Sequence, residues 1–323
     1  MRVLHLSNIA DVPPTLSKYL RKNNIKSVVV VFRKDPFGFE YDYNMNVDRY
    51  PRFIQSTVRF HDLFRYFRNY DIYHLHSSSF LPFYVDAPLL RIMKKKIIYH
   101  HHGSDVRYKG IPFFSKFGHL RLVSTPDLLE YAKDAIWIPN PVDIEKTDKI
   151  ANKVNKNNSL DLDKDKIYIL YSPRGQYNIR GTFFIENVLK NIISKYKEVK
   201  IIKVENLPKK EFLIKVANAD IIIDGLIIGW YGVLSIEAMA LKKPVCCYLR
   251  EDLKEKYAPN CPIINSTPEN LQGNLEMLIE DEKLRYEIGK KSRRYVKKIH
   301  DAKVIVKKLI KMYNILIGDK NGV

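Results

Sequence analysis

Cysteine is scarce in this sequence: there are three in 323 residues, and two of them are adjacent, at Cys246 and Cys247. So few thiols cannot form a disulfide framework, and none has the CxxC spacing typical of a metal site. This cysteine usage is typical of a reducing compartment, and it predicts a cytoplasmic protein.

Long hydrophobic runs are missing as well. Charged or polar residues interrupt every apolar run before about eighteen residues, and no basic segment followed by an apolar core opens the chain. Export and membrane spanning are therefore not expected. The chain does contain 46% hydrophobic and 12% aromatic residues, enough for roughly two folded domains.

Acidic residues are outnumbered. There are 55 Lys and Arg against 36 Asp and Glu, which gives a net charge of +19. This excess favours an acidic partner, and nucleic acid, an anionic membrane surface and phosphorylated small molecules all qualify. Charge alone does not choose among them.

Short β-branched runs alternate with helical patterns from the first residue. The predicted strands of the first part are Val3–Leu6, Val28–Phe32, Ile72–Leu75, Ile97–Tyr99 and Leu122–Ser124. Several are apolar on both faces, as buried parallel strands are. Between the first two, residues 15–22 follow Pro13 and Pro14 and fit a helix whose first turn accepts proline.

The alternation stops at residues 146–166, where Asn, Lys and Asp dominate, and then resumes. The later strands are predicted at 167–171, 199–204, 221–223 and 245–248, with helices at 182–197, 209–217, 233–241, 268–280 and 281–317. We therefore predict an α/β protein with two Rossmann-like doubly wound domains. The first spans residues 1–150, a linker spans 151–166, and the second spans 167–323.

Polar residues follow several of the predicted strands. Ligands of open parallel sheets bind beyond the carboxyl ends of the strands, so these residues are candidates for a site. They are Ser7 and Asn8 after the first strand, His74 and His76 at the third, and residues 100–105 (HHHGSD) at the fourth. Any single histidine among them has the alternative role of capping a strand or packing in the core.

Imidazoles and Asp105 are also competent metal ligands. Successive strand residues point to opposite faces, so His100 and His102 can share a side while His101 cannot. No carboxylate-rich helix completes a ligand set, and we expect no metal site. The turn is better suited to a rim that hydrogen bonds a polyhydroxylated ligand, because Gly103 allows close backbone approach.

The second half contains a strand, a glycine-containing loop, a helix and another strand between Asp224 and Val245. Backbone N–H groups at the start of such a helix can hold a diphosphate. Glu237 falls about one turn into that helix, where its carboxylate can accept hydrogen bonds from two vicinal hydroxyls such as those of a ribose. The alternative is an amphipathic helix on which Glu237 is simply solvated.

Together these segments resemble the retaining glycosyltransferases of family 4, which have the GT-B fold of two facing Rossmann-like domains. The resemblance covers nearly the full length, and its most specific piece is residues 229–245. Supporting segments are MRVLHLSNIA at the start, DIYHLHSS, YHHHGSD, IPNPVD at 138–143 and RGT at 180–182. In this fold a C-terminal helix often crosses back onto the first domain, and residues 307–317 are the candidate.

The resemblance implies transfer of a sugar from a UDP- or GDP-linked donor to a glycan, a lipid-linked molecule or another hydroxyl acceptor. It implies retention at the anomeric carbon, with no obligatory metal and no other cofactor. A glutamate at the position of Glu237 binds the nucleotide ribose in that family, and Arg174 and Arg180 match the basic residues that hold the diphosphate. Guanidinium groups suit phosphate oxygens, although either arginine alone can be a solvated loop charge.

His102 resembles the first-domain histidine that faces the donor sugar in the family, so His102 and Asp105 are the candidate catalytic residues. The remaining candidates surround these groups. They are Gly229, Tyr231, Gly232 and Val233 on the donor side, and Asn8 and His76 on the acceptor side.

Three departures from the family pattern stand out. The family glutamate eight positions before Glu237 is replaced by Gly229, which puts recognition of the donor sugar in question. The turn after the first strand, residues 8–11, contains no glycine. Arg174 and Arg180 are one residue further apart than in the family.

Other functions compete with this one. A sugar-nucleotide epimerase shares the architecture but needs carboxylates for proton transfer, where this chain offers mainly histidines. A catalytically inactive homologue that binds glycans or a protein partner is the other alternative, favoured by Gly229.

The most basic stretch, residues 285–311, has aliphatic residues at helical spacing, so one side is expected to be buried. Nucleic-acid binding normally needs aromatic platforms as well, so it is not expected here. The same stretch suits anionic lipid headgroups, and it predicts peripheral contact with the inner membrane face.

Overall fold

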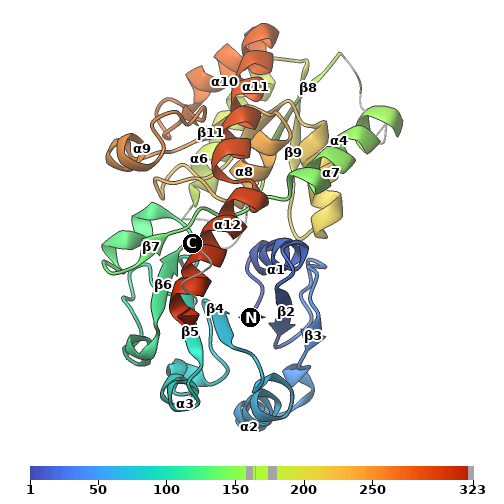
Figure 1. Ribbon diagram of the computed structural model, residues 1–323. Coiled ribbons are helices and arrows are strands. Elements are labelled where there is room, and N and C mark those ends of the chain that lie inside the picture. The colour runs from blue at the N-terminus through green and yellow to red at the C-terminus, as the bar shows by residue number, and fades with distance from the viewer. Residues whose placement is uncertain (158–162, 164, 174–179, 319–323) are drawn as a thin grey trace. The chain divides into compact units, whose positions relative to one another are not determined.

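The structure is a computed structural model that describes residues 1–157, 163, 165–173 and 180–318. The chain divides into two compact units (Figure 1). Unit 1 comprises Met1–Pro141 and Ala302–Val323, so the blue and cyan strands and the red C-terminal helix belong together. Unit 2 comprises Val142–Asp301.

The described residues of unit 1 form a seven-stranded parallel sheet in the order β3-β2-β1-β4-β5-β6-β7. Its strands are β1 (Arg2–Leu6), β2 (Lys26–Val31), β3 (Tyr43–Asn44), β4 (Ile72–His76), β5 (Lys96–His101), β6 (Leu120–Val123) and β7 (Ile136–Trp137). Its α-helices are α1 (Val12–Lys22), α2 (Arg52–Asp62), α3 (Ala87–Ile92) and α12 (Ala302–Ile317). All of β4 is buried, so both faces of this strand are covered even though apolar residues and histidines alternate along it.

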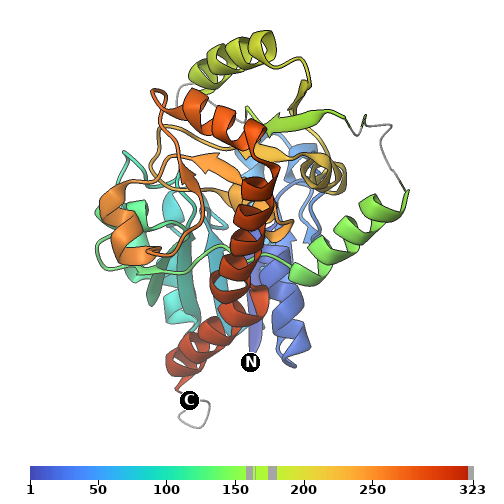
Figure 2. The same ribbon diagram turned by 90° about the horizontal axis from the view of Figure 1, so that it is seen from above.

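Helix α12 packs against α1 in unit 1 (Figure 2). A single helix was predicted for 281–317, but the structure divides it into α11 (Glu282–Ile299) and α12. The division occurs where the His300 carbonyl accepts the Val142 N–H at 2.8 Å and Asp301 pairs with Val142. These contacts compete with helix continuation, and they lie at the boundary between the two units.

The described residues of unit 2 form a five-stranded parallel sheet in the order β12-β11-β10-β8-β9. Its strands are β8 (Ile167–Tyr171), β9 (Val199–Lys203), β10 (Ile221–Ile223), β11 (Val245–Cys247) and β12 (Ile264–Asn265). Its helices are α4 (Ile144–Asn157), α6 (Thr182–Lys195), α7 (Lys209–Asn218), α8 (Val233–Ala240), α9 (Glu251–Tyr257), α10 (Leu271–Glu280) and α11. The predicted class, with two Rossmann-like parallel sheets, is confirmed.

Part of the predicted linker is helical. Residues 151–157 belong to α4, and residues 158–162 and 164 lie outside the described residues. The Asp143 carboxylate accepts the Lys146 N–H at 3.0 Å at the start of α4, and Thr147 is buried. Helix α4 packs against α7 with Ile144 and Thr147 buried at its start, and these contacts order a segment that is otherwise polar.

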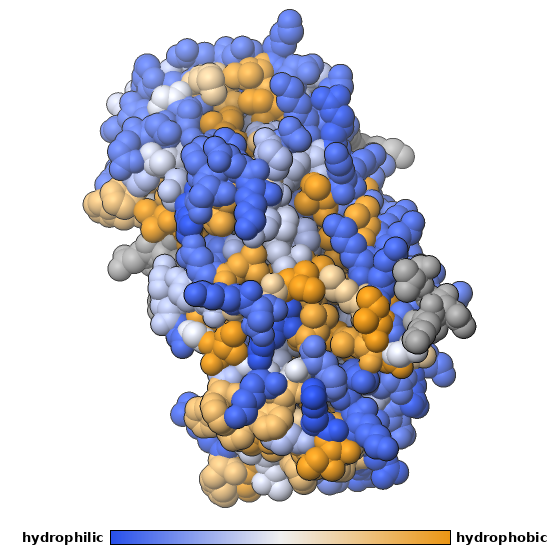
Figure 3. Space-filling model, turned by 60° about the vertical axis from the view of Figure 1, so that its left-hand side comes forward, coloured by the Kyte–Doolittle hydropathy of each residue, from blue (hydrophilic) through white to orange (hydrophobic). Residues whose placement is uncertain are grey.

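Polar residues cover most of one face of the molecule, with apolar residues gathered in patches between them (Figure 3). Within the described part of the chain, no helix combines the length and the apolar character that crossing a membrane requires.

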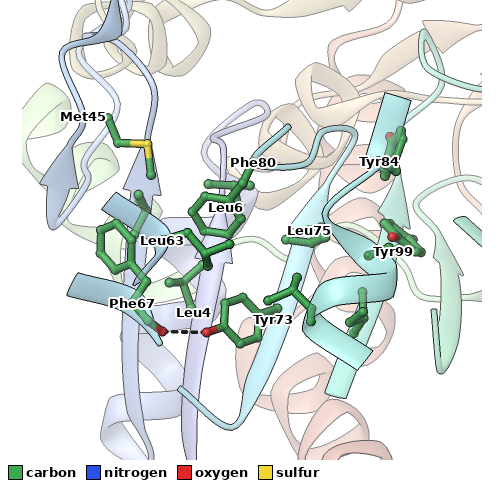
Figure 4. Packing of buried hydrophobic residues seen from close by; sticks show 14 of the residues in the cluster. Leu4, Leu6, Met45, Leu63, Phe67, Tyr73, Leu75, Phe80, Tyr84 and Tyr99 are labelled. Atoms are coloured by element: carbon green, nitrogen blue, oxygen red, sulfur yellow. Dashed lines mark hydrogen bonds between the residues drawn. The ribbon is translucent and has the colours of Figure 1, made fainter. Parts of the chain in front are cut away.

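A hydrophobic core lies on one face of the unit 1 sheet (Figure 4). Leu4, Leu6, Tyr73 and Leu75 come from the central strands, and the Tyr73 hydroxyl donates to the Phe67 carbonyl at 2.6 Å. Because side chains alternate along a strand, the residues between these apolar ones point to the opposite face. That face carries the histidines.

A substitution at Gly289 of α11 tests how closely this helix packs against the end of α8 in unit 2. A Cβ placed on it would lie 2.0 Å from the Lys242 carbonyl oxygen just after α8. We expect Gly289→Ala to lower the free energy of unfolding by at least about 2 kcal/mol, because rigid backbone occupies the space. Urea unfolding measures it.

The matched control is Gly273→Ala on the exposed side of α10, where nothing lies within 4 Å of the added Cβ. It should raise stability by about 0.5–1 kcal/mol through helix propensity. Equal effects of the two substitutions would contradict the close approach of α11 to α8.

Candidate functional site

The strand order of each sheet reverses at one point, and ligands of such sheets bind beyond the strand ends at that point. In unit 2 the reversal lies between β8 and β10. The loops that follow these two strands hold Arg180 and residues 224–232, the segments that the sequence indicated. In unit 1 the reversal lies between β1 and β4, where Asn8 and the histidines were expected.

Asp224, directly after β10, organises the unit 2 site. Its Oδ1 accepts from the Arg180 guanidinium at 2.9 Å. Its Oδ2 accepts from the Gly232 N–H at 3.2 Å and from the Ser235 hydroxyl at 2.6 Å. The carboxylate therefore joins the loop after β8 to the amino-terminal turn of α8.

Arg180 remains accessible in this arrangement, because its side chain is 30% exposed while that of Asp224 is 3% exposed. Its carbonyl accepts the Leu226 N–H at 3.0 Å, which fixes the backbone beside the loop after β10. Arg174 lies outside the described residues. Gly232 is the N-cap of α8 and Val233 its first residue, both partly exposed, so this helix start can face a ligand.

Glu237 is not a solvated surface residue. It is 6% exposed, and its Oε1 accepts a hydrogen bond from the Lys209 ammonium, which is 7% exposed and lies at the start of α7. A buried ion pair is costly to desolvate, and breaking one partner of it is strongly destabilising. Lys209 was missed by the sequence analysis because nothing in its own segment marks it.

Gly229 adopts a left-handed backbone with φ +85°, which a glutamate would rarely adopt. A Cβ there would lie 2.6 Å from Cγ of Arg250. The Arg250 side chain, paired with Asp252 at 2.7 Å, therefore lies over this loop. The glycine at this position thus suits both the local backbone and the neighbouring Arg250 side chain.

Tyr231 is 1% exposed. Its hydroxyl lies 2.8 Å from the Tyr295 hydroxyl and 2.9 Å from Nε2 of His300. Its side chain holds the loop after β10 against Tyr295 of α11 and His300. The donor-side role of Tyr231 stays a prediction.

The loops after the central strands of unit 1 contain strained backbone. Ser7, Ala10 and Asp11 after β1 have φ of 72°, 55° and 65°, and Ser77 after β4 has φ of 50°. The turn that lacks the expected glycine thus keeps glycine-like conformations, each with an energetic cost. Asn8 holds the turn, donating to the Glu40 carbonyl at 3.1 Å and accepting the Asp11 N–H at 3.2 Å.

Asp105 orders the turn that follows β5. Its Oδ1 accepts the backbone N–H groups of His102 and Gly103 at 3.2 and 3.0 Å, and its Oδ2 lies 2.6 Å from Nδ1 of His101. Burial opposes its ionisation, but the hydrogen bond and positive field of His101 hold the Asp105 pKa below its ordinary value. This carboxylate positions His102 and is itself largely occupied.

The histidines form a buried layer on the face of β1, β4 and β5 opposite the apolar core. Its members, here called the histidine layer, are His5, His74, His76, His100 and His102. His76 is fully buried, with Nε2 3.0 Å from Nδ1 of His5 and Nδ1 3.0 Å from Nε2 of His102. His76 therefore contacts other rings, among them the partly exposed His102, and its acceptor-side role stays a prediction. Sequence reasoning singled out neither His5 nor the contacts of His74 and His100.

Burial lowers the pKa of these imidazoles, the pKa of His102 to about 4 and that of His5 to about 3. Asp105 offsets part of the effect at His102. The layer is thus neutral at pH 7, and His102 offers a neutral imidazole that can hydrogen bond rather than a strong general acid.

Comparison with known proteins finds no matching family model and no matching curated protein. Solved structures do match over almost the whole chain. HepE from Anabaena, in complex with UDP and glucose, is 12% identical with a TM-score of 0.70 over 97% of this chain and 99% of that one. Sucrose-phosphate synthase from Thermosynechococcus elongatus is 14% identical with a TM-score of 0.68 over 98% and 100%.

A third structure is the UDP-GlcNAc 2-epimerase of Neisseria meningitidis bound to UDP-GlcNAc, which is 16% identical with a TM-score of 0.61 over 97% and 99%. At these identities the likeness establishes the two-domain GT-B fold and no more.

The neutral histidines predict acid sensitivity. His102 has a lower pKa folded, about 4, than unfolded, 6.5, so the unfolded chain binds more protons between these values. Stability should therefore be highest above pH 6.5 and fall as the pH approaches 4. In urea unfolding with EDTA present, the free energy of unfolding should depend less steeply on pH in His102→Gln than in the wild type. The difference in slope should correspond to at most one bound proton. Identical slopes would show that His102 is not held neutral.

Proposed function

We propose that this protein is a glycosyltransferase that moves a sugar from a UDP- or GDP-linked donor to a hydroxyl acceptor on a glycan or a lipid-linked molecule, with retention. The observation that carries the proposal is the unit 2 constellation: the start of α8, Arg180 and Glu237 lie around the switch point of one sheet. Neighbours of the same fold were solved with UDP and with UDP-glucose, which supports the same donor class.

Each part of the constellation suits one part of a nucleotide sugar. The helix start supplies N–H groups and a favourable dipole for the diphosphate. Arg180 supplies a guanidinium for phosphate oxygens and for charge that develops on the leaving group. A diphosphate neutralised in this way needs no divalent ion, so we propose metal-independent transfer.

Glu237 is the proposed ribose ligand. A carboxylate has about four lone-pair directions, so it can keep the hydrogen bond from Lys209 and still accept from two hydroxyls. Lys209 would then fix the rotamer of the carboxylate. The buried pair is a positioning device for this role.

His102 and Asp105 are the proposed catalytic-side groups in unit 1. Asp105 fixes the turn, and the neutral imidazole of His102 is suited to hydrogen bond a sugar hydroxyl rather than to transfer a proton. An epimerase needs proton transfer by carboxylates, and Asp105 is committed to His101 and two N–H groups. This geometry favours transfer over epimerisation.

Nucleotide binding is the first test. Ligands of the folded state raise the melting temperature, so UDP, GDP, ADP and their sugars should be compared with and without Mg²⁺. We expect a shift from UDP or GDP compounds that is independent of Mg²⁺. Glu237→Gln should weaken binding of the nucleotide that stabilises the wild type at least about tenfold, because a neutral amide cannot accept the charge-assisted hydrogen bonds of the ribose hydroxyls.

The matched control is Glu276→Gln on α10, a half-buried glutamate paired with Lys195 at 3.1 Å. It should leave the affinity unchanged. If no nucleotide stabilises the wild type, the protein is an inactive glycan or partner binder. If UDP-GlcNAc is isomerised without acceptor, it is an epimerase.

The acceptor side of the proposal includes an anionic membrane surface. Helix α11 exposes Lys290, Lys291, Arg294, Lys297 and Lys298. Arg293 on the same helix is instead buried, donating to the Ala240 carbonyl and to Asp148 at 2.6 Å each. One basic side of α11 is thus available to lipid headgroups, which supports a lipid-linked acceptor.

Liposome sedimentation tests this contact. Replacing Lys291, Arg294 and Lys298 together by Gln should reduce binding to vesicles containing phosphatidylserine by roughly a hundredfold at low salt, at about 1 kcal/mol per charge. Replacing three surface lysines of unit 2 outside α11, Lys197, Lys200 and Lys210, should have a much smaller effect. Equal binding to neutral and anionic vesicles would overturn the contact.

A further inference from the structure

The histidine layer has no role in the proposed transfer beyond His102. Five imidazoles gather in the interior of unit 1, and four of them are fully buried. An apolar residue would fill this space at lower cost, because each ring carries polar atoms that must find partners. The presence of five imidazoles at these positions therefore needs a chemical explanation.

Neutral imidazoles cannot satisfy this layer among themselves. In one row, the Tyr313 hydroxyl lies 2.6 Å from Nδ1 of His74, whose Nε2 lies 3.2 Å from Nδ1 of His100. In the other row, His5, His76 and His102 are linked in the same way. A neutral imidazole has one N–H donor and one acceptor nitrogen. Within a row, each ring therefore donates to the neighbour on one side and accepts from the neighbour on the other, and all rings do so in the same direction.

Each row then ends on a buried nitrogen without a partner. These atoms are Nε2 of His100 and Nε2 of His5. If the hydrogen bonds of a row are donated toward its end atom, that atom is an N–H without an acceptor. If they are donated the other way, it is a lone pair without a donor. A bare nitrogen lone pair in a cluster of imidazoles is the donor that a transition metal ion requires.

Two overlapping sets of three histidines offer one ligand atom each within 4.8 Å of one another: His5, His74 and His76, and His76, His100 and His102. Three imidazoles are a known ligand set for Zn²⁺, with Zn–N about 2.0–2.1 Å. A tetrahedral ion would bring the ligand atoms to about 3.3 Å from one another, so side-chain rotations must close the remaining distance. Ring flips exchange Nδ1 and Nε2 without moving the backbone.

The second set is the better site for two reasons. His102 is partly exposed, which gives an ion a route from solvent, whereas all members of the first set are fully buried. The Asp105 carboxylate also acts on His102, and its negative charge offsets part of the charge of a divalent ion. The first set has no such neighbour among the charges that act on its rings.

We propose that His76, His100 and His102 bind a divalent first-row transition metal ion, with Zn²⁺ the best fit to three imidazoles. Coordination through Nε2 of His102 would leave the proton on Nδ1 and fix the ring beside the turn of Asp105. The proposed ligands belong to unit 1 and the groups proposed for the donor diphosphate belong to unit 2, so metal binding can be measured independently of the proposed transferase activity. The sequence alone led us to expect no metal site, because no carboxylate-rich helix completed a ligand set around His100 and His102.

Cobalt titration of the untagged, EDTA-treated full chain tests the site. Co²⁺ should bind one per chain with the visible absorption of a tetrahedral nitrogen site, and Zn²⁺ should displace it. His76→Gln, His100→Gln and His102→Gln should each weaken binding by roughly a hundredfold or more, because each removes a ligand. His61→Gln, an exposed histidine whose side chain is 57% exposed, should bind as the wild type does.

Circular dichroism and thermal unfolding establish that each variant is folded, and His102→Gln is the deciding variant because its side chain is partly exposed. Octahedral absorption, binding weaker than millimolar, or equal loss in His61→Gln would overturn the proposal. Loss in His5→Gln with none in His102→Gln would place the ion in the other set and overturn this one. Nucleotide binding is read separately, so failure of the transferase proposal leaves this result unaffected.

Discussion

Burial of the central strands on both faces is the constraint on which unit 1 depends. Side chains alternate along β1, β4 and β5, so one face can carry Leu4, Tyr73 and Leu75 while the other carries His5, His74 and His76. The register pairs His5 with His74 and His76 with His100, so the rings stack across strands. Every candidate group of this unit inherits its position from that register.

The same constraint explains what the sequence could predict. Apolar runs located the strands, because continuous hydrophobicity is the local signature of a two-sided parallel strand. The linker was expected to be irregular because α4 has few apolar residues, yet contact with α7 supplied the missing stability. The break between α11 and α12 escaped detection because its cause, pairing of Asp301 with Val142, joins residues far apart in sequence.

The candidate site also has a part that the sequence predicts and a part that only the fold reveals. The loop and helix from Gly229 to Glu237 form a local motif, and the sequence contained all of it. Lys209 and Asp224 act through contacts across the sheet, where only the fold shows that their charges meet Glu237 and Arg180. Tyr231 lies within the local motif, but its side chain hydrogen bonds outside it, to Tyr295 and His300. The sequence did not reveal these contacts.

The groups proposed to bind the nucleotide are separate from the position expected to recognise the sugar. Arg180 belongs to the network of Asp224 at the start of α8, and Glu237 on the same helix pairs with Lys209. Gly229 departs from the resembled pattern, and its left-handed backbone and the Arg250 side chain both disfavour a glutamate there. Placing a carboxylate at this position would require the loop to rearrange as well as the residue to change. For the proposed function, this predicts a sugar that is recognised by groups other than a carboxylate at position 229.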